Sequence, residues 1–160
     1  TYSNEAAEYF YHLGMIQDTI PVELNRKEIL RRENSRSEMI IYGRLPLMIT
    51  AQCIHKNMLG CMHQPKVLNL KDRYSVYFPV KNFCSECYNV IYNSLPVCLF
   101  KEDVTVKKIA PAAVRLSFTT ETEEETEQIL TIYGDIYKNG GILGQMPMEC
   151  TNGHFKRGVE

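Results

Sequence analysis

The chain has 160 residues, of which 44% are hydrophobic and 23% are charged, and its formal net charge is −1. A chain of this size can bury the core of one domain without covalent help, and no apolar run is long enough to cross a bilayer. The balanced charge gives no overall attraction to nucleic acid or anionic lipid, so a partner of that kind would need a local patch. We expect a cytoplasmic protein with no membrane segment. Because it opens on a helical pattern without an initiating Met, we also expect a fragment of a longer chain.

The first predicted helix begins near Ser3 or Asn4, since either side chain can cap its exposed N–H groups. Gly14 stands where a left-handed residue would end this helix. The apolar residues 15–20 follow, and we interpret them as a short strand.

A second helix is predicted to begin at Asn25, because Glu28 three residues later completes a capping-box pattern. We expect it to run to Arg32, and residues 39–42 then form a buried strand. Strand, helix and strand with short connections predict a right-handed crossover and a parallel sheet. Residues 1–42 are therefore interpreted as βα units.

Residues 43–113 have a different character, because they contain five of the six cysteines and five of the seven prolines. We interpret them as a cysteine-bearing insertion that carries function. Within it, residues 67–70 and 75–78 flank the polar turn 71–73, which predicts a β-hairpin with Pro79 at its exit.

The βα pattern returns in residues 114–141. Residues 114–118 alternate like a strand, and Thr119 or Thr120 can cap a helix over residues 121–137 that ends at Gly140-Gly141. The core-facing positions of this helix would be Ile129, Ile132, Tyr133 and Ile136. With residues 142–160 as a C-terminal tail, the sequence predicts a single α/β domain or fragment.

Four of the six cysteines suggest a metal site. Cys53 and Cys61 flank seven residues, and Cys84 and Cys87 form a C-x-x-C pair that places two thiolates on one turn. The predicted hairpin would bring the two pairs together, and thiolates suit zinc or an iron-sulfur cluster. The alternative is that they are small buried hydrophobes, because free cysteine is among the most buried residue types.

The remaining two cysteines are Cys98, which lies in an apolar run, and Cys150, which lies near the tail. We expect both to be plain core or surface residues. Since no signal peptide is visible, all six cysteines are expected to be reduced.

Several blocks of this sequence resemble the collagenase-like peptidases, the U-32 family. They are residues 42–48 (YGRLPLM), Cys53, Cys61, residues 70–73 (LKDR), residues 78–80 (FPV), Cys87 and residues 91–96 (IYNSLP), with further similar segments at 21–25 and 153–160. The resemblance covers nearly the whole chain and places it in the C-terminal part of the family's core region.

The resemblance implies an incomplete (β/α)-barrel-like piece with an inserted cysteine-rich β-hairpin region, whose exposed apolar surface would favour a homodimer. It also implies an activity for the full-length parent. Other family members are similar to enzymes that hydroxylate tRNA or rRNA pyrimidines and hold a four-iron four-sulfur cluster on four cysteines. The implied metal ligands here are Cys53, Cys61, Cys84 and Cys87.

Two other functions remain open. The family name implies a protease, a hydrolase, but the sequence has no G-x-S-x-G elbow and no H-E-x-x-H helix. The second is a non-catalytic structural zinc module. Arg44 and Arg73 lie in the motif blocks, and either can bind a carboxylate or phosphate group of a substrate through its guanidinium fork, unless it forms a structural ion pair.

Overall fold

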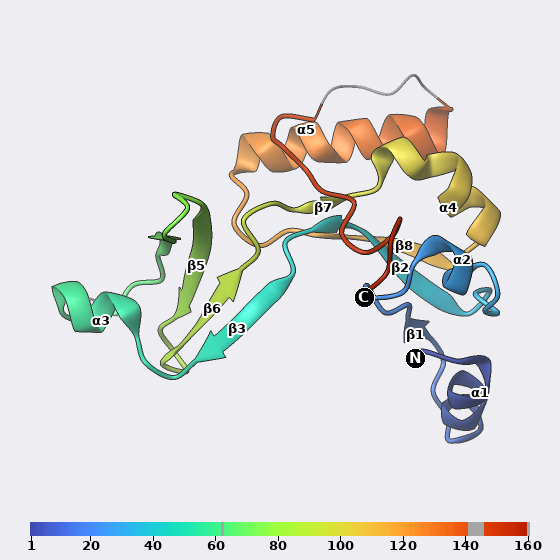
Figure 1. Ribbon diagram of the computed structural model, residues 1–160, viewed down its shortest axis with the longest axis horizontal. Coiled ribbons are helices and arrows are strands. Elements are labelled where there is room, and N and C mark those ends of the chain that lie inside the picture. The colour runs from blue at the N-terminus through green and yellow to red at the C-terminus, as the bar shows by residue number, and fades with distance from the viewer. Residues whose placement is uncertain (62, 141–145, 160) are drawn as a thin grey trace.

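The computed structural model describes residues 1–61, 63–140 and 146–159, which form a mixed α/β structure with two sheets (Figure 1). The first sheet, with the helices around it, is called the α/β body. The second, with one short helix at its outer end, is called the cysteine-bearing sheet. Among the described residues, no helix combines the length and the apolar character needed to cross a membrane.

The α/β body is built around the central strand β2 (Ser37–Gly43). Strands β1 (Asp18–Thr19) and β8 (Ala113–Ser117) both pair with β2 in parallel, and β7 (Val97–Cys98) pairs with it antiparallel. The parallel pairing of β1 with β2 confirms the parallel sheet predicted for residues 1–42, and the right-handed crossover stays a prediction. The described strands do not close into a barrel.

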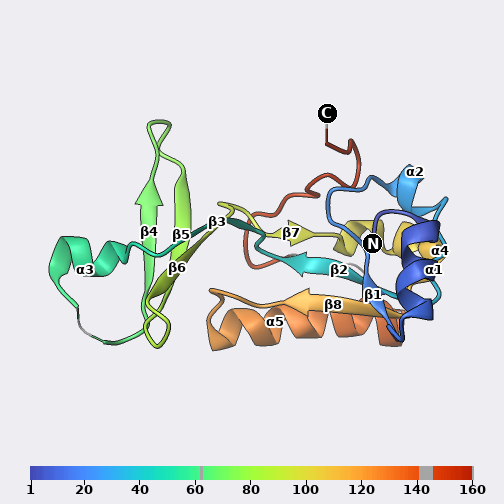
Figure 2. The ribbon, with the colours of Figure 1, turned by 90° about the horizontal axis from the view of Figure 1, so that it is seen from below.

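The helices of the body are α1 (Asn4–His12), α2 (Arg26–Ile29), α4 (Asp103–Ile109) and α5 (Glu123–Gly134), the last continued by a π-helical turn (Asp135–Asn139). Helix α5 packs along the sheet, as Figure 2 shows, and the Tyr133 hydroxyl donates a 2.8 Å hydrogen bond to the Ile41 carbonyl of β2. Ile129, Tyr133 and Ile136 are buried as predicted, whereas Ile132 is half-buried.

The cysteine-bearing sheet contains β3 (Pro46–Thr50), β4 (Val67–Lys71), β5 (Tyr77–Phe83) and β6 (Tyr88–Tyr92) in the antiparallel order β3-β6-β5-β4. Helix α3 (Ile54–Leu59) lies at its outer end, away from the body (Figures 1 and 2). Strands β4 and β5 form the hairpin predicted around residues 71–73. Pro79 lies inside β5, opposite Asn69, rather than at its exit.

Two helix boundaries differ from the sequence-based expectation. Helix α5 is capped by Thr122 and not by Thr119 or Thr120, because the Glu121 carboxylate accepts the backbone N–H groups of both earlier threonines at 2.6 and 2.9 Å. Helix α2 has the predicted capping box but ends at Ile29. Beyond it the chain tightens into a turn that directs Arg32 inward to a buried ion pair with Asp18.

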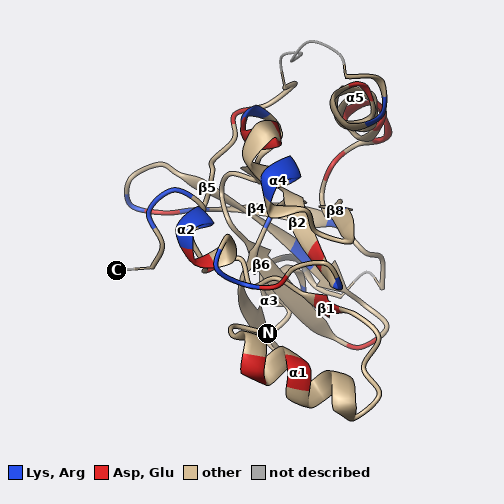
Figure 3. Ribbon diagram, turned by 90° about the vertical axis from the view of Figure 1, so that its right-hand side faces the viewer, with Lys and Arg blue, Asp and Glu red and all other residues tan. Residues whose placement is uncertain are grey.

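The charged residues of the body are spread over its helices. Acidic residues lie on α1 and α5, and basic residues lie on α2 and α4 (Figure 3). The acidic first turn of α5 contains Glu123, Glu124 and Glu125, where the helix dipole favours carboxylates.

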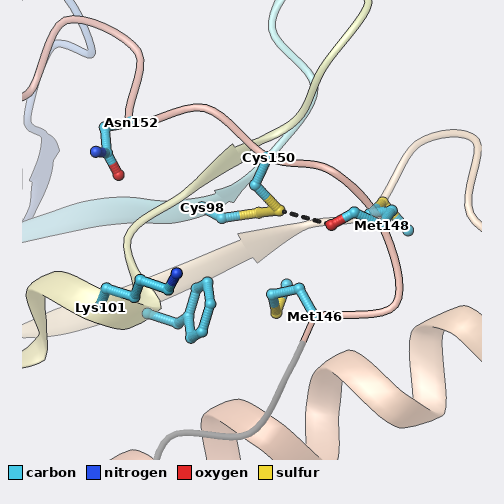
Figure 4. A pocket seen from close by; sticks show the side chains of 7 residues that line it. Cys98, Lys101, Met146, Met148, Cys150 and Asn152 are labelled. Atoms are coloured by element: carbon cyan, nitrogen blue, oxygen red, sulfur yellow. Dashed lines mark hydrogen bonds between the residues drawn. A yellow bond between two sulfur atoms is a disulfide. The ribbon is translucent and has the colours of Figure 1, made fainter.

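The expectation that all six cysteines are reduced is wrong for two of them. Cys98 and Cys150 form a disulfide, with their Cα atoms 5.6 Å apart (Figure 4). The C-terminal segment runs beside β7, where Cys98 N–H donates to Thr151 O at 2.8 Å and Thr151 N–H donates to Pro96 O at 2.9 Å. This pairing places the two cysteines side by side, although 52 positions separate them in the sequence.

Two adjacent chain passages join the body to the cysteine-bearing sheet. The outgoing passage follows Gly43, and the returning passage follows Asn93, whose N–H donates to Leu45 O at 2.9 Å. Arg44 bridges the two passages by donating to the carbonyl oxygens of Asn93 and Ser94. A further contact lies outside these passages, where Lys81 Nζ of β5 donates to Thr119 O of the body at 2.9 Å.

Candidate functional site

Four cysteines line a single cavity of about 380 Å³ at the outer end of the cysteine-bearing sheet. Cys53 and Cys61 come from the loop around α3, and Cys84 and Cys87 come from the turn between β5 and β6. All four are free thiols. The structure therefore brings together the four residues that the sequence analysis selected as metal ligands.

The α3 loop delivers the first two thiols. Cys53 is the N-cap of α3, and its sulfur accepts the N–H of Lys56 at 3.4 Å. Gly60 ends the helix with a positive φ of 84°, and buried His55 forms a 3.0 Å hydrogen bond to the Gly60 carbonyl. This closure turns the chain back, so that Cys61 faces the same cavity as Cys53.

The β5–β6 turn delivers the other two thiols. Phe83 and Tyr88 pair in register at the base of the turn and stack with their ring centroids 4.7 Å apart. Cys87 adopts a left-handed conformation with φ of 56°, which reverses the chain after the C-x-x-C sequence. The Asn82 side chain donates a hydrogen bond to the Cys84 sulfur at 3.2 Å.

The convergence of the thiols changes the ionisation of Cys84. Burial raises the pKa of the Cys84 thiol, and the negative charges that Cys53, Cys61 and Cys87 carry when ionised raise this pKa further. A cation bound beside the Cys84 sulfur would act in the opposite direction and lower this pKa. The electrostatics of the cavity therefore favour a cationic ligand once the thiols are deprotonated.

The donor set suits zinc or an iron-sulfur cluster, because both are held by Cys thiolates. In the parts of the chain that the structure describes, no group of three or more His, Cys, Asp or Glu side chains is already arranged around a common metal position. The four thiols thus share a cavity without forming a closed ligand set. Metal identity stays a prediction.

The two arginines predicted to bind a substrate lie outside this cavity. Arg44 borders a separate cavity of about 230 Å³ between the two sheets, together with Glu121 and Glu125. Arg73 lies at the tip of the β4–β5 hairpin, with its guanidinium 4.7 Å from the centre of the Tyr74 ring. Anion binding by either arginine stays a prediction.

Sequence reasoning missed the side chains that support the cysteines. Asn82, Phe83 and Tyr88 all line the cavity, and so does His63. A signal was present in the sequence, since residues 82–89 read N-F-C-S-E-C-Y-N, with an aromatic residue and an asparagine placed symmetrically on either side of the C-x-x-C pair.

A further cavity, of about 440 Å³, lies beside the Cys98–Cys150 disulfide in the body. Figure 4 shows Met146 and Met148 next to this disulfide, with Lys101 on the other side. Both cysteines are used in the covalent bond, so this cavity offers no free thiol.

Comparisons of the chain with protein-family models, with curated proteins and with solved structures find no match. The resemblance to the U-32 peptidases, and the activities it implies, therefore stay predictions.

Proposed function

We propose that Cys53, Cys61, Cys84 and Cys87 hold a four-iron four-sulfur cluster, and that the chain is part of an α/β enzyme that hydroxylates RNA pyrimidines. The observation that carries the cluster proposal is the common cavity of the four free thiols. A bound cluster would supply electron transfer or an open iron for substrate binding. Thiolates of this kind have no evident use in peptide hydrolysis, so a redox function fits the cavity better than a protease.

The protein's own residues prepare this cavity in two ways. Hydrogen bonds from Lys56 N–H and the Asn82 side chain reach the sulfurs of Cys53 and Cys84, and such bonds tune a thiolate-held cluster. The stacked rings of Phe83 and Tyr88 form an apolar wall on one side of the cavity, whereas Cys61 and Cys87 are exposed. The site is therefore supported by side chains on both strands that border it.

The RNA proposal rests on the resemblance and gains support from the charge of the cysteine-bearing sheet. Residues 44–96 contain six Lys or Arg and two Asp or Glu, a net charge of +4, while the other residues contain twelve and seventeen, a net charge of −5. Three cations of this sheet lie near aromatic rings, in the pairs Lys71 with Tyr77, Arg73 with Tyr74, and Lys81 with Phe83. Cations beside aromatic rings suit the phosphates and bases of a single strand.

The proposal includes a finer statement of the fold. The parallel set β1, β2 and β8 is the arrangement that a piece of a (β/α) barrel would have. The adjacent positions of the outgoing and returning chain passages support the interpretation of the cysteine-bearing sheet as an insertion. A homodimer is part of the same proposal, because Leu47, Met48 and Ile49 of edge strand β3 are exposed.

The experiment that tests the cluster measures iron, sulfide, zinc and the visible absorption spectrum of protein purified without oxygen. Near-stoichiometric iron and sulfide are expected, and both should be lost in a Cys53→Ser/Cys87→Ser variant. Ser85→Ala is the matched control, because Ser85 lies in the same turn and is exposed. Its metal content should equal that of the wild type.

The second candidate function is a structural zinc module, which the all-thiol donor set also suits. Stoichiometric zinc in place of iron would select it, and the absence of any metal from anaerobic protein would reject both candidates. RNA binding is tested separately with a pyrimidine-rich single-stranded RNA. Lys71→Ala/Arg73→Ala should weaken binding and reduce its salt dependence, while Lys108→Ala in α4 should not.

A further inference from the structure

Two asparagines occupy matching places beside the four-thiol cavity. Asn82 on β5 and Asn89 on β6 are paired in register, one step below the stacked Phe83 and Tyr88. Their exposed fractions are 4% and 0%. Asparagine is seldom buried so completely unless its amide is hydrogen-bonded, so the partners of these amides indicate what the two residues do.

Asn82 holds the chain that follows Cys61. Its side-chain oxygen accepts the N–H of Lys66, and its side-chain nitrogen donates to Gln64 O at 3.3 Å. The same nitrogen lies 3.2 Å from the Cys84 sulfur. One buried side chain therefore connects the end of the α3 loop to a thiol of the β5–β6 turn.

Asn89 holds the chain that precedes Cys53. Its side-chain nitrogen donates to Gln52 O at 2.8 Å. The two asparagines thus fasten the two ends of the loop that contains Cys53 and Cys61, and both act from the strands that carry Cys84 and Cys87. Their side-chain bonds add to the backbone pairing of β3 with β6 and of β4 with β5, which also joins the two cysteine-bearing segments.

We infer that Asn82 and Asn89 are positioning residues that set the distance between the pair Cys53 and Cys61 and the pair Cys84 and Cys87. The inference uses the four-thiol cavity of the proposed function but does not depend on which metal binds there. Asn82 uses both groups of its amide, a donor and an acceptor on one short side chain, whereas Asn89 uses its donor and its oxygen has no partner among the described residues. An aspartate at position 82 would keep the acceptor for Lys66, lose the donor to Gln64 O and to Cys84, and add a negative charge beside the thiolates.

The test uses the complete chain in its metal-free form and a short bis-maleimide, which alkylates two thiols only when they lie close together. Cross-links between the two cysteine pairs are mapped by mass spectrometry, and Co²⁺ affinity is measured from thiolate-to-metal absorption. Asn82→Ala and Asn89→Ala should each reduce the yield of cross-links between pairs, and should weaken Co²⁺ binding about 10- to 100-fold. Asn69→Ala, on the exposed side of β4, is the matched control and should change neither quantity.

Asn82→Asp keeps the proposal testable if an alanine variant unfolds. It retains the bond to Lys66 N–H, so the loop end should stay attached, while cross-links to Cys84 should fall selectively. Unchanged cross-linking and Co²⁺ affinity in folded Asn82→Ala, Asn89→Ala or Asn82→Asp protein would overturn the inference. If wild-type protein holds no metal but the asparagine variants still lose cross-links, the metal proposal fails and the positioning role stands.

Discussion

The α/β body buries Ile29, Ile41 and Ile129 at exposures of 2% or less, and a disulfide closes its C-terminal segment. The cysteine-bearing sheet buries fewer apolar side chains, leaves four thiols free, and places two asparagines at the centre of its outer half. The body is therefore stabilised mainly by apolar burial and a covalent link. The cysteine-bearing sheet depends more on hydrogen bonds, such as those of buried Asn82 and Asn89, so the two regions are stabilised by different means.

The largest effect expected in the body is the loss of the Cys98–Cys150 bond. The disulfide spans 52 positions, and a loop of that size restricts the unfolded chain by about 4 kcal/mol. A Cys98→Ala/Cys150→Ala variant should lose roughly this stability in urea unfolding. Hydrogen exchange should show faster exchange in β7 and the C-terminal segment and unchanged protection in β5 and β6. Equal loss of protection in both regions would show that they do not behave as separate units.

The second prediction concerns the ion pair of buried Asp18 and Arg32 in the body. Burial alone would raise the pKa of Asp18, but hydrogen bonds from the N-terminal amine, Ser37, Thr1 and Tyr11 outweigh burial and lower it. Asp18→Asn leaves the Arg32 charge buried without its partner and should cost about 3 kcal/mol at pH 7. Asp103→Asn, which removes a more exposed pair with Lys107, should cost less than about 0.5 kcal/mol.

The pH dependence of that variant sharpens the prediction. Because the folded pKa of Asp18 is lowered, its contribution is complete above its unfolded pKa of about 3.9 and is lost as the pH falls through the folded value. The difference in unfolding free energy between wild type and Asp18→Asn should therefore shrink below about pH 4. A difference that stays constant down to pH 2 would contradict the lowered pKa.

The smallest effect is predicted at the junction of the two regions. Gly43 has a φ of +143°, and a Cβ atom there would lie 2.5 Å from the Ser117 carbonyl oxygen. Gly43→Ala should destabilise the protein by about 2 kcal/mol and increase exchange in β3 as well as in β2. Gly134→Ala is the control, because a Cβ in that helical position meets no atom within 4 Å, and it should stabilise by about 0.5–1 kcal/mol.

Local signals predicted much of this structure. Two signals that act over a few residues were interpreted correctly. They are the capping box of Asn25 and Glu28 and the polar turn at residues 71–73. The start of α5 was misplaced because Glu121 binds the amides of Thr119 and Thr120, so that the threonines precede the helix instead of capping it. A competing side chain one or two residues away is enough to move a boundary.

Long-range pairings were predicted only where a local element implied them. The hairpin around residues 71–73 brings its two flanks together, and this allowed the meeting of Cys53 and Cys61 with Cys84 and Cys87 to be expected. No local pattern indicates that the C-terminal segment returns to β7, so the Cys98–Cys150 bond was missed. The asparagines were overlooked because most of their partners are backbone groups of a distant loop, so the symmetric pattern of residues 82–89 does not by itself reveal what the two amides bind.

The 2.9 Å hydrogen bond from Asn93 N–H to Leu45 O bears on how a segment of this kind could be gained or lost during evolution. The segment between these residues leaves and re-enters the body at neighbouring points, and insertions are tolerated at sites of that kind. A single genetic event could add or delete the cysteine-bearing sheet without changing how β2 pairs with its neighbouring strands. For the same reason, the cysteine-bearing sheet is a candidate for grafting onto another protein in which two strand ends lie side by side.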